Sequence, residues 1–231
     1  MTLHTDVEMA RTHADPSNFN QNRPLRRQPI RAYGHVGKRL LDIAIVVAAA
    51  PIALLVVALF CPLIMLDGGS PFFTQTRIGR RGRVFRMVKL RSMVRNAEDR
   101  LEAYLAADPE RRREWNESQK LRHDPRITRV GHIIRKTSID ELPQLWNVLK
   151  GEMSIVGPRP MMPSQRPLYP GTVYYALRPG ITGLWQVSAR NESSFADRGE
   201  FDARYFRSVS LKTDLWIIMC TVKVVLRGTG C

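Results

Sequence analysis

The strongest pattern in the chain is an uninterrupted apolar run at residues 43–66, IAIVVAAAPIALLVVALFCPLIML. The run has 24 residues and no charged side chain, whereas about 20 apolar residues suffice for a helix to cross the core of a bilayer. It starts far from Met1 and ends without a small-residue cleavage site, which argues against a cleavable signal peptide. We therefore expect a helix that lies within a membrane.

Both flanks of this apolar run are basic. Lysine and arginine resist translocation, so we expect both ends of the run on the cytoplasmic side. A segment whose ends lie on the same side must turn back, and Pro51, near its middle, breaks helical hydrogen bonding. We predict a re-entrant helix hairpin over residues 34–68, and a single-pass helix kinked at Pro51 stays open as the alternative. The flanking basic residues are Arg26, Arg27, Arg31, Lys38, Arg39, Arg77, Arg80, Arg81, Arg83, Arg86, Lys89, Arg91 and Arg95.

Outside the apolar run, the patterns predict an α+β domain that is mostly helical, with amphipathic interfacial helices and a few short strands. Residues 1–33 are polar and lack apolar periodicity, which predicts a disordered N-terminal arm. The cytoplasmic domain, at the membrane interface, is then 69–231. Its last expected helix, 211–228, has a broad apolar face that fits a core, a membrane interface or a homodimer contact. The other expected elements are two short strands in 70–93, two charged helices in 96–119, an amphipathic helix at 138–150, a short strand in 153–157, a turn-rich segment at 177–191 and a helix at 195–210.

The charge of the chain limits the range of partners. Its 231 residues carry a formal net charge of +15, so we expect an anionic partner: nucleic acid, a phospholipid surface or a phosphorylated substrate. Three cysteines without metal-ligand spacing favour a reducing compartment over a disulfide framework. The long apolar run, and the lack of a recognisable nucleic-acid-binding motif, weigh against nucleic acid.

An adjacent pair of acids, Asp140 and Glu141, lies in the segment TSIDELPQLWNVLKGEMSIVGPRP at residues 137–160. Ser138 and Glu141 have the spacing of a capping box, so the simplest interpretation is the start of a helix. A helix N-terminus also attracts phosphate, and Arg159 follows in the Pro-Arg-Pro turn. Proteins bind Mg²⁺ with one or two carboxylates and substrate phosphates, and a carboxylate can attack phosphorus. The pair therefore fits either a cap alone or a metal-dependent phosphoryl-transfer site.

Three motifs together resemble a known family. They are KLRSM at 89–93, DPRITRVGHIIRKTSIDELPQLWNVLKGEMSIVGPRP at 124–160 and RPGITGLWQVSARN at 178–191, and they follow a basic-flanked apolar segment. In this order they resemble the bacterial sugar transferase family, the monotopic polyprenyl-phosphate phosphoglycosyl transferases. The resemblance runs from about Lys38 to about Gly228, and the chain is similar in length to the members that initiate exopolysaccharide synthesis.

The resemblance implies a membrane enzyme that transfers a sugar-1-phosphate from a UDP-sugar to undecaprenyl phosphate and releases UMP, in the first step of exopolysaccharide repeat-unit assembly. Asp140 is the expected nucleophile, through a covalent aspartyl phospho-sugar intermediate and ping-pong kinetics, and Glu141 the expected ligand of Mg²⁺. The catalytic domain would face the cytoplasm at the bacterial inner membrane, in contact with phospholipids. The sugar stays open: galactose, glucose or an N-acetylated sugar.

By position in the motifs, seven further residues are implied as substrate-binding: Lys89, Arg91, Arg159, Gln144, Arg178, Gln186 and Asp202. The first three would contact phosphates. The chain departs from the family pattern at Ala50, which replaces the usual serine before Pro51, and at Ala189, which replaces the usual glycine. Two other interpretations stay open: a basic, non-enzymatic membrane adaptor in which the acids only cap a helix, and a nucleic-acid-binding protein.

Overall fold

The computed structural model describes residues 33–118, 121, 124–188 and 195–226, so the predicted disordered arm lies outside the described residues except for Tyr33. A short π-helical turn, Tyr33–Gly37, leads into the apolar helix α2, Lys38–Met65. Within the described residues, α2 is the one helix long and apolar enough to cross a membrane. The predicted apolar helix is therefore confirmed.

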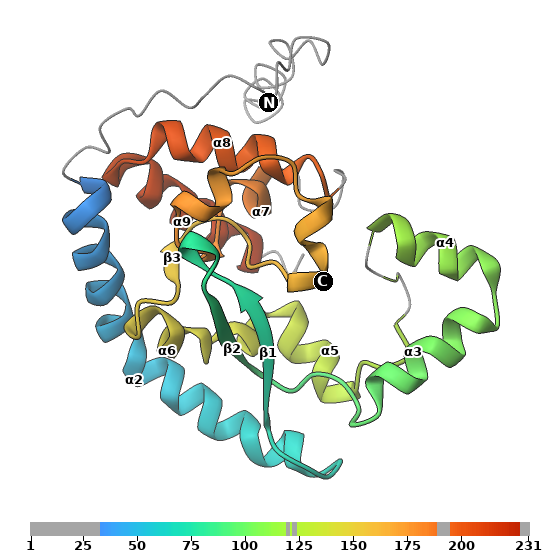
Figure 1. The fold of residues 1–231 in the computed structure, drawn as a ribbon. Helices are drawn as coiled ribbons and strands as arrows, with labels where there is room; N and C mark the ends of the chain where they lie inside the picture. Colours follow the sequence, from blue (N-terminus) through green and yellow to red (C-terminus); the bar gives the residue numbers. More distant parts are fainter. Residues whose placement is uncertain (1–32, 119–120, 122–123, 189–194, 227–231) are drawn as a thin grey trace, which may run out of the picture.

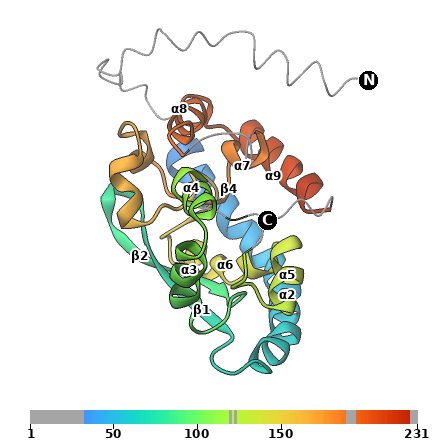
Figure 2. The same ribbon diagram turned by 90° about the vertical axis from the view of Figure 1, so that its right-hand side faces the viewer.

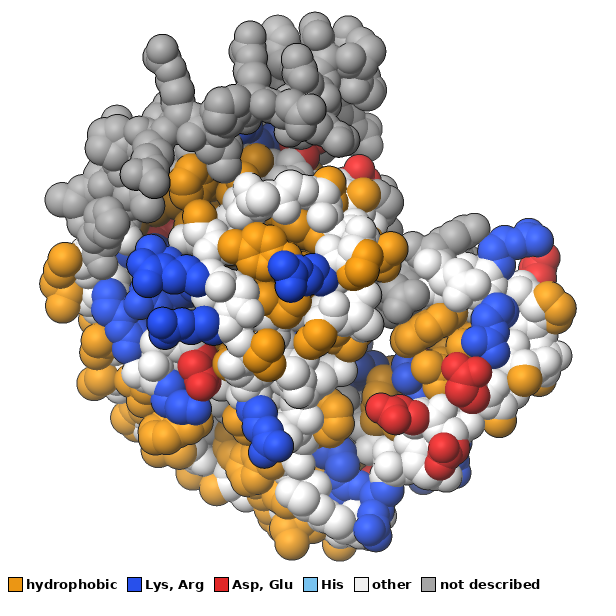
Figure 3. Space-filling view, viewed as in Figure 1, with side chains coloured by type: hydrophobic (Ala, Val, Ile, Leu, Met, Phe, Trp, Pro, Cys, Tyr) orange, Lys and Arg blue, Asp and Glu red, His pale blue; other side chains and the backbone are white. Residues whose placement is uncertain are grey.

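Helix α2 is continuous in the structure and contains Pro51 and Pro62. It bends along the outside of the folded domain (Figure 1). Most of its large apolar side chains are exposed, including Ile52 and Leu55 near its middle. Figure 3 shows apolar side chains along the margin where α2 lies, with lysine and arginine side chains beside them. A reversal of the helix within the membrane stays a prediction.

Both ends of α2 are attached to the same domain. Near its start, the Asp42 carboxylate accepts hydrogen bonds from Ser154 Oγ and Ile155 N, each at 2.9 Å. Near its end, Ile64 packs in a buried cluster with Leu90 and Ile134. The exposed middle of the helix therefore lies between two anchored ends.

The first two strands form the expected hairpin. Strands β1, Phe72–Ile78, and β2, Val84–Leu90, pair antiparallel, with Ile78 opposite Val84 and Phe72 opposite Leu90. Their connecting turn has Arg81 in the left-handed region, at φ 59°. Phe85 and Met87 of β2 enter the main core. Because alternate residues of a strand lie on the same face, Lys89 lies on the same face of β2 as Phe85 and Met87.

Two helices confirm the expected charged pair: α3, Ala97–Ala106, and α4, Pro109–Ser118. They project from one side of the domain in Figure 1 and lie toward the viewer in Figure 2. Helix α5, Arg129–Lys136, follows, and the Thr128 hydroxyl caps it by accepting from Gly131 N at 2.9 Å. The chain then turns directly into the segment that carries the acid pair.

The prediction of one capped helix at 138–150 is wrong. The segment holds a short 3₁₀ turn, Ile139–Glu141, and then α6, Gln144–Leu149. Ser138 lies in the left-handed region, at φ 58°, and its side chain makes no cap hydrogen bond. The reason is that α5 ends only two residues earlier, so Ser138 reverses the chain between two helices. The acid pair therefore lies in a tight turn.

The remaining elements build the second half of the domain. Strand β3, Ser154–Val156, pairs parallel with β4, Gly180–Thr182, and confirms the short strand expected in 153–157. A Cβ atom on Gly180 would lie 2.1 Å from Gly157 N, so these backbones cross too closely for a side chain. Two short 3₁₀ helices, Pro163–Leu168 and Val173–Ala176, lie between the strands. Three α-helices follow: α7, Leu184–Ser188; α8, Arg198–Ser208; and α9, Leu211–Leu226.

Candidate active site

A short ionic cluster joins the acid pair to the hairpin. Lys89 Nζ lies 3.4 Å from Asp140 Oδ2 and 2.9 Å from Glu141 Oε1. Asp140 is buried, with 7% of its surface exposed, while Glu141 also lines a cavity. Strand β2 positions the lysine, and the turn after α5 positions both acids. The structure thus brings together three of the predicted site residues from segments about 50 residues apart in sequence.

Burial raises the pKa of Asp140, although the ammonium group of Lys89 lowers it in opposition. The neighbouring Glu141 carboxylate raises the pKa of Asp140 further, and Arg135 lowers it. A buried carboxylate that lies beside a second carboxylate needs positive charge to stay ionised. The Asp140 side chain therefore depends on nearby cations to stay ionised.

Arginine side chains from three elements lie within electrostatic range of Arg159, which is in the turn after β3. Burial and the charge of Arg159 lower the pKa of Arg77, in β1, to about 10. The same two causes lower the pKa of Arg198, in α8, to about 10. They also lower the pKa of Arg135, in α5, where Asp140 opposes them. Arg77, Arg135 and Arg198 therefore each lie within electrostatic range of Arg159, and such a group of cations suits a multiply charged anion.

Two of these arginines are held in place by their surroundings. Arg77 Nη1 donates to Pro160 O at 3.0 Å, which ties β1 to the turn that carries Arg159. The Arg198 guanidinium lies 4.3 Å from the ring centroid of Trp185 and 4.3 Å from that of Phe195. Among the described residues, Arg77 Nε and Arg198 Nε are buried without a hydrogen-bond partner. Both guanidinium groups therefore retain a donor for a further ligand.

Asp202, predicted from its motif position, lies next to this arginine group. Tyr169 Oη donates to Asp202 Oδ2 at 2.8 Å, and Asp202 is 6% exposed. Burial raises the pKa of Asp202 to about 7, while the Tyr169 hydrogen bond and the charge of Arg198 lower it in opposition. Asp202 therefore supports Arg198 electrostatically from within α8.

The other predicted site residues fall in different surroundings. Gln186 lines the cavity beside Glu141, and its Nε2 donates to Ile181 O at 2.8 Å. Gln144 is buried in α6, with 2% of its surface exposed. Arg178 Nε donates to Gly151 O at 2.9 Å, near the crossing of β3 and β4.

Arg91 is held at the end of the apolar helix α2. Its Nη2 donates to Ile64 O at 3.0 Å and to Asp67 Oδ1 at 2.7 Å. Arg91 and Arg178 thus anchor backbone segments, whereas Lys89, Asp140 and Glu141 contact one another. The substrate contacts that the motifs predict for Lys89, Arg91 and Arg178 stay predictions.

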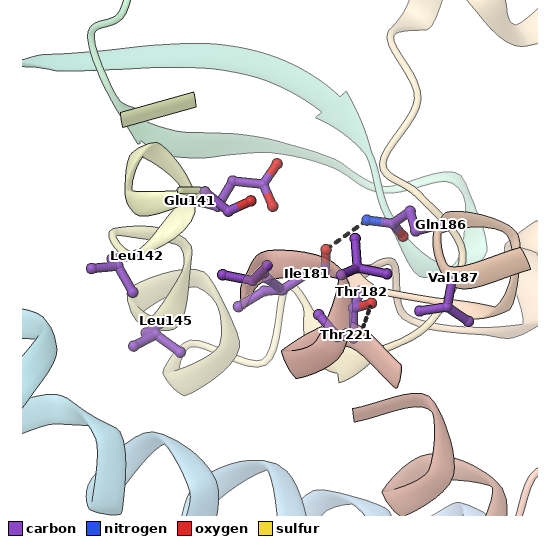
Figure 4. Close-up of a pocket in the computed structure, with 11 residues that line it drawn as sticks. Glu141, Leu142, Leu145, Ile181, Thr182, Gln186, Val187 and Thr221 are labelled. Carbon is purple, nitrogen blue, oxygen red and sulfur yellow. Dashed lines mark hydrogen bonds between the residues drawn. The ribbon is translucent and has the colours of Figure 1, made fainter. Parts of the chain in front are cut away.

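A cavity of about 160 Å³ begins at the turn of residues 138–141, here called the acid turn, and extends between α6, β4, α7 and α9 (Figure 4). Figure 4 shows Glu141 above Leu142 and Leu145, with Ile181 facing them from β4. The Gln186 Oε1 atom is buried and has no hydrogen-bond partner among the described residues. The full lining is Ser138, Glu141, Leu142, Leu145, Ile181, Thr182, Gln186, Val187, Thr221, Val224 and Val225.

The donor set at the acid turn is compatible with Mg²⁺. No group of three or more His, Cys, Asp or Glu side chains that could hold a metal occurs among the described residues. Mg²⁺ needs fewer protein ligands, because substrate phosphates and water complete its octahedron. Glu141, with its carboxylate at the cavity, matches this requirement, and Asp140 lies beside it.

Arg77 and Arg198 are the site residues that motif reading missed. Arg77 lies in a strand whose exposed and half-buried positions mix, so periodicity does not single it out. Arg198 starts α8 with no motif around it, and its role depends on the approach of Trp185, from a separate helix. Only the tertiary arrangement places them together near Arg159.

Comparison with known proteins places these residues in a family. The chain matches the family model described as bacterial sugar transferase over residues 33–228. It is 50% identical over 197 residues to the UDP-galactose-lipid carrier transferase of Erwinia amylovora, across 84% of this chain and 41% of that protein. It is 42% identical over 211 residues to the exopolysaccharide production protein ExoY of Rhizobium meliloti, across 87% of this chain and 90% of that protein.

A third relative is the undecaprenyl-phosphate galactose phosphotransferase of Salmonella typhimurium, which is 50% identical over 166 residues, across 71% of this chain and 35% of that protein. The chain thus spans less than half of the Erwinia and Salmonella proteins and most of the Rhizobium protein. These matches confirm the predicted family and, with it, the predicted class of enzyme. On the match over residues 33–228, the chain belongs to the bacterial sugar transferase family.

Proposed function

We propose that this chain is a phosphoglycosyl transferase, which moves a sugar-1-phosphate from a UDP-sugar to undecaprenyl phosphate and so initiates exopolysaccharide repeat-unit assembly. The observation that carries the proposal is the Lys89-bridged pair Asp140 and Glu141, beside an arginine group and close to a membrane helix. The names of the Erwinia and Salmonella relatives support the lipid-carrier acceptor, and both support a galactose donor.

The reaction would proceed in two displacements. An oxygen of the Asp140 carboxylate attacks the β-phosphorus of the UDP-sugar, and the bond from that phosphorus to the bridging oxygen breaks. UMP leaves with the bridging oxygen, and a phospho-sugar stays on Asp140. A phosphate oxygen of undecaprenyl phosphate then attacks the same phosphorus and releases the aspartate as a carboxylate. Two half-reactions of this kind give ping-pong kinetics.

The neighbouring residues would serve this chemistry by charge. Lys89 keeps Asp140 ionised and lies where a phosphate oxygen would approach. Arg159, with Arg77 and Arg198 beside it, would hold the diphosphate and stabilise the negative charge on departing UMP. Glu141 would hold Mg²⁺, which when bound shields the phosphate charges that otherwise repel the attacking carboxylate.

The attachment of both ends of α2 to one domain supports a cytoplasmic, re-entrant topology. Asp42 binds β3 at one end, and Ile64 packs on Leu90 and Ile134 at the other. A domain on one side of the bilayer can hold both ends only if the helix enters and leaves on that side. The bilayer would then cover the exposed middle around Pro51, at the bacterial inner membrane, and the basic flanks would bind anionic phospholipids.

The test is to incubate purified protein in lipid nanodiscs with Mg²⁺, undecaprenyl phosphate and a panel of UDP-sugars, and to follow UMP. We expect UMP release with UDP-galactose, UDP-glucose or an N-acetylated UDP-sugar, and trapping of ³²P-labelled phospho-sugar on the protein when the acceptor is left out. Asp140→Asn should lose both by at least about a thousandfold, because a neutral amide is a poor nucleophile. Full activity in Asp140→Asn would refute the aspartyl mechanism, whereas a wild type that releases no UMP from any donor would favour a non-enzymatic adaptor.

A further inference from the structure

The cavity beside the acid pair combines two kinds of surface. At one end, the lining consists of Ser138 and Glu141 of the acid turn, and Glu141 contacts Lys89 there. The rest of the lining is mainly aliphatic and comes from the start of α6 and from β4, α7 and α9 (Figure 4). Its aliphatic residues are Leu142, Leu145, Ile181, Val187, Val224 and Val225. A ligand that fills it should therefore be charged at one end and apolar along its length.

The two substrates of the proposed reaction differ in this respect. A nucleotide sugar is polar on both sides of its diphosphate, because it carries hydroxyl groups on one side and a ribose on the other. A polyprenyl phosphate is apolar from the first carbon after its phosphate. With the phosphate near Lys89, the next atoms of the molecule fall at the mouth of the cavity, which begins at Glu141.

Exposed apolar side chains lie on two of the helices that line the cavity. Trp146, next to Leu145 in α6, is 60% exposed, and Val222, next to Thr221 in α9, is 47% exposed. Helix α6 also packs against the membrane helix α2. A chain that leaves the cavity along α6 therefore meets exposed apolar side chains on its way to the bilayer, and its burial there removes apolar surface from water.

We propose that the cavity between α6, β4 and α9 binds the first isoprene units of the polyprenyl phosphate acceptor, with the phosphate at Lys89 and the acid turn. This inference rests on the proposed function and assigns the acceptor side of the same site. The aliphatic cavity residues then select acceptors by the structure of the chain next to the phosphate, and these aliphatic residues take no part in the first half-reaction.

The test changes the cavity without touching the acid turn. Val225→Trp fills the space from α9, and Val225→Thr keeps its shape but adds a hydroxyl. The matched control is Val84→Trp, because Val84 is 64% exposed in β2 and does not line the cavity. Each variant is assayed in nanodiscs with Mg²⁺ and the UDP-sugar that the wild type uses. The burst of UMP without acceptor counts the folded, competent sites in each preparation.

We expect both Val225 variants to keep the wild-type burst amplitude per mole of purified protein. Their kcat/KM for undecaprenyl phosphate should fall by about tenfold or more for the tryptophan, and by about threefold for the threonine. The loss should already appear with a two-isoprene phosphate, and should vanish with ethyl phosphate, which lacks isoprene units. The control variant should match the wild type with every acceptor.

Other results overturn the inference. If Val225→Trp keeps its kcat/KM for undecaprenyl phosphate, the cavity does not bind the acceptor. If its KM for the UDP-sugar rises while acceptor kinetics stay constant, the cavity belongs to the donor. The absence of a UMP burst in the wild type would instead refute the proposed function, a failure that is visible before any cavity variant is compared.

Discussion

At the scale of single residues, the ionisation of the buried Asp140 carboxyl depends on a small number of neighbouring cations. Burial raises the pKa of Asp140, and Lys89, at 3.4 Å, is the largest opposing influence. In the proposed reaction Asp140 attacks as a carboxylate, so activity should be lost as pH falls through the pKa of Asp140 in the folded protein. Any change that raises this pKa must therefore move the acid limb of the pH profile to higher pH.

Lys89→Met tests this dependence. The variant keeps a similar length but removes the positive charge, so we expect the acid limb of the UMP burst to move up by about one pH unit. At neutral pH the burst rate should also fall by at least about tenfold, since the lysine faces the phosphate. The matched control is Lys150→Met, which breaks an exposed pair with Glu152 and should leave the profile unchanged. An unshifted acid limb in Lys89→Met would contradict the electrostatic role.

Arg198 provides a second test at this scale, on the donor side. Arg198→Ala removes a guanidinium whose Nε has no hydrogen-bond partner among the described residues and which lies over the rings of Trp185 and Phe195. If it holds the diphosphate of the donor, the inhibition constant of UMP should rise by about tenfold. Arg204→Ala, in the same helix and paired with Glu200, is the control and should change it less than twofold. Equal UMP inhibition in both variants would remove Arg198 from the site.

The raised pKa of Asp202 predicts that the stability of the fold depends on pH. Its pKa is raised from 3.8 to about 7, so the folded chain keeps a proton that the unfolded chain releases. The contribution to stability is therefore largest below the unfolded pKa and declines as pH rises toward the folded one. Asp202→Asn keeps an oxygen that can accept from Tyr169 Oη but cannot titrate. Between about pH 5 and about pH 8, the wild type should lose at least about 4 °C more in melting temperature than the variant. Parallel changes in both proteins would contradict the shifted pKa.

At the scale of elements, the join between α2 and the domain rests on a buried polar network. Asp214, at the start of α9, is 0% exposed and accepts hydrogen bonds at 2.6–2.7 Å from Tyr33 Oη, Lys38 Nζ and Tyr205 Oη. These partners come from the entry to α2 and from α8. Removal of a buried carboxylate that accepts several hydrogen bonds lowers the free energy of unfolding strongly, because it leaves Lys38 without its charge partner.

Asp214→Ala should therefore destabilise the fold by about 3–5 kcal/mol and loosen the start of α2. Thermal unfolding and limited proteolysis between Tyr33 and α2 would measure the two effects. The control is Asp67→Ala, whose carboxylate pairs with Arg91 and is more exposed, so it should cost about 1 kcal/mol or less. Similar losses in both variants would mean that the network contributes little to the attachment of α2.

Local sequence patterns predicted most of the elements. The apolar run, the hairpin, the charged helix pair and β3 each follow from periodicity or turn residues within a short window. The tight turn that carries the acid pair did not follow from such patterns, because the spacing of Ser138 and Glu141 also fits the capping box of a helix. Only the end of α5 at Lys136 shows that the segment does not form one helix over 138–150. The positions of Arg77 and Arg198 beside Arg159 were also beyond local patterns, since long-range packing sets them.

At the scale of the whole molecule, the arrangement joins a membrane helix to a polar site without a linker. Lys89 of the site and Leu90 of the contact with α2 are adjacent in β2, and Arg91 holds the last turn of α2 through Ile64 O. In the proposed membrane arrangement, the end of α2 would therefore fix the height of the acid turn relative to the bilayer. A charged donor from the cytoplasm and a lipid phosphate could meet at that height only if the domain lies against the membrane surface.

The topology of α2 is the prediction that decides this arrangement. We introduce single cysteines at Val36, which is 63% exposed before the helix, and at Ser70, which follows it, in a chain whose native cysteines are replaced by serine. A membrane-impermeant maleimide should label neither site in spheroplasts with intact inner membranes and both sites in inverted vesicles, because basic flanks and the shared domain keep both ends in the cytoplasm. A third cysteine at Leu55, in the exposed middle, should stay unlabelled in both preparations, since the bilayer covers it. Labelling of Val36→Cys and Ser70→Cys from opposite sides would establish a single-pass helix, and one end of α2 would then have to leave the domain that holds it in the structure.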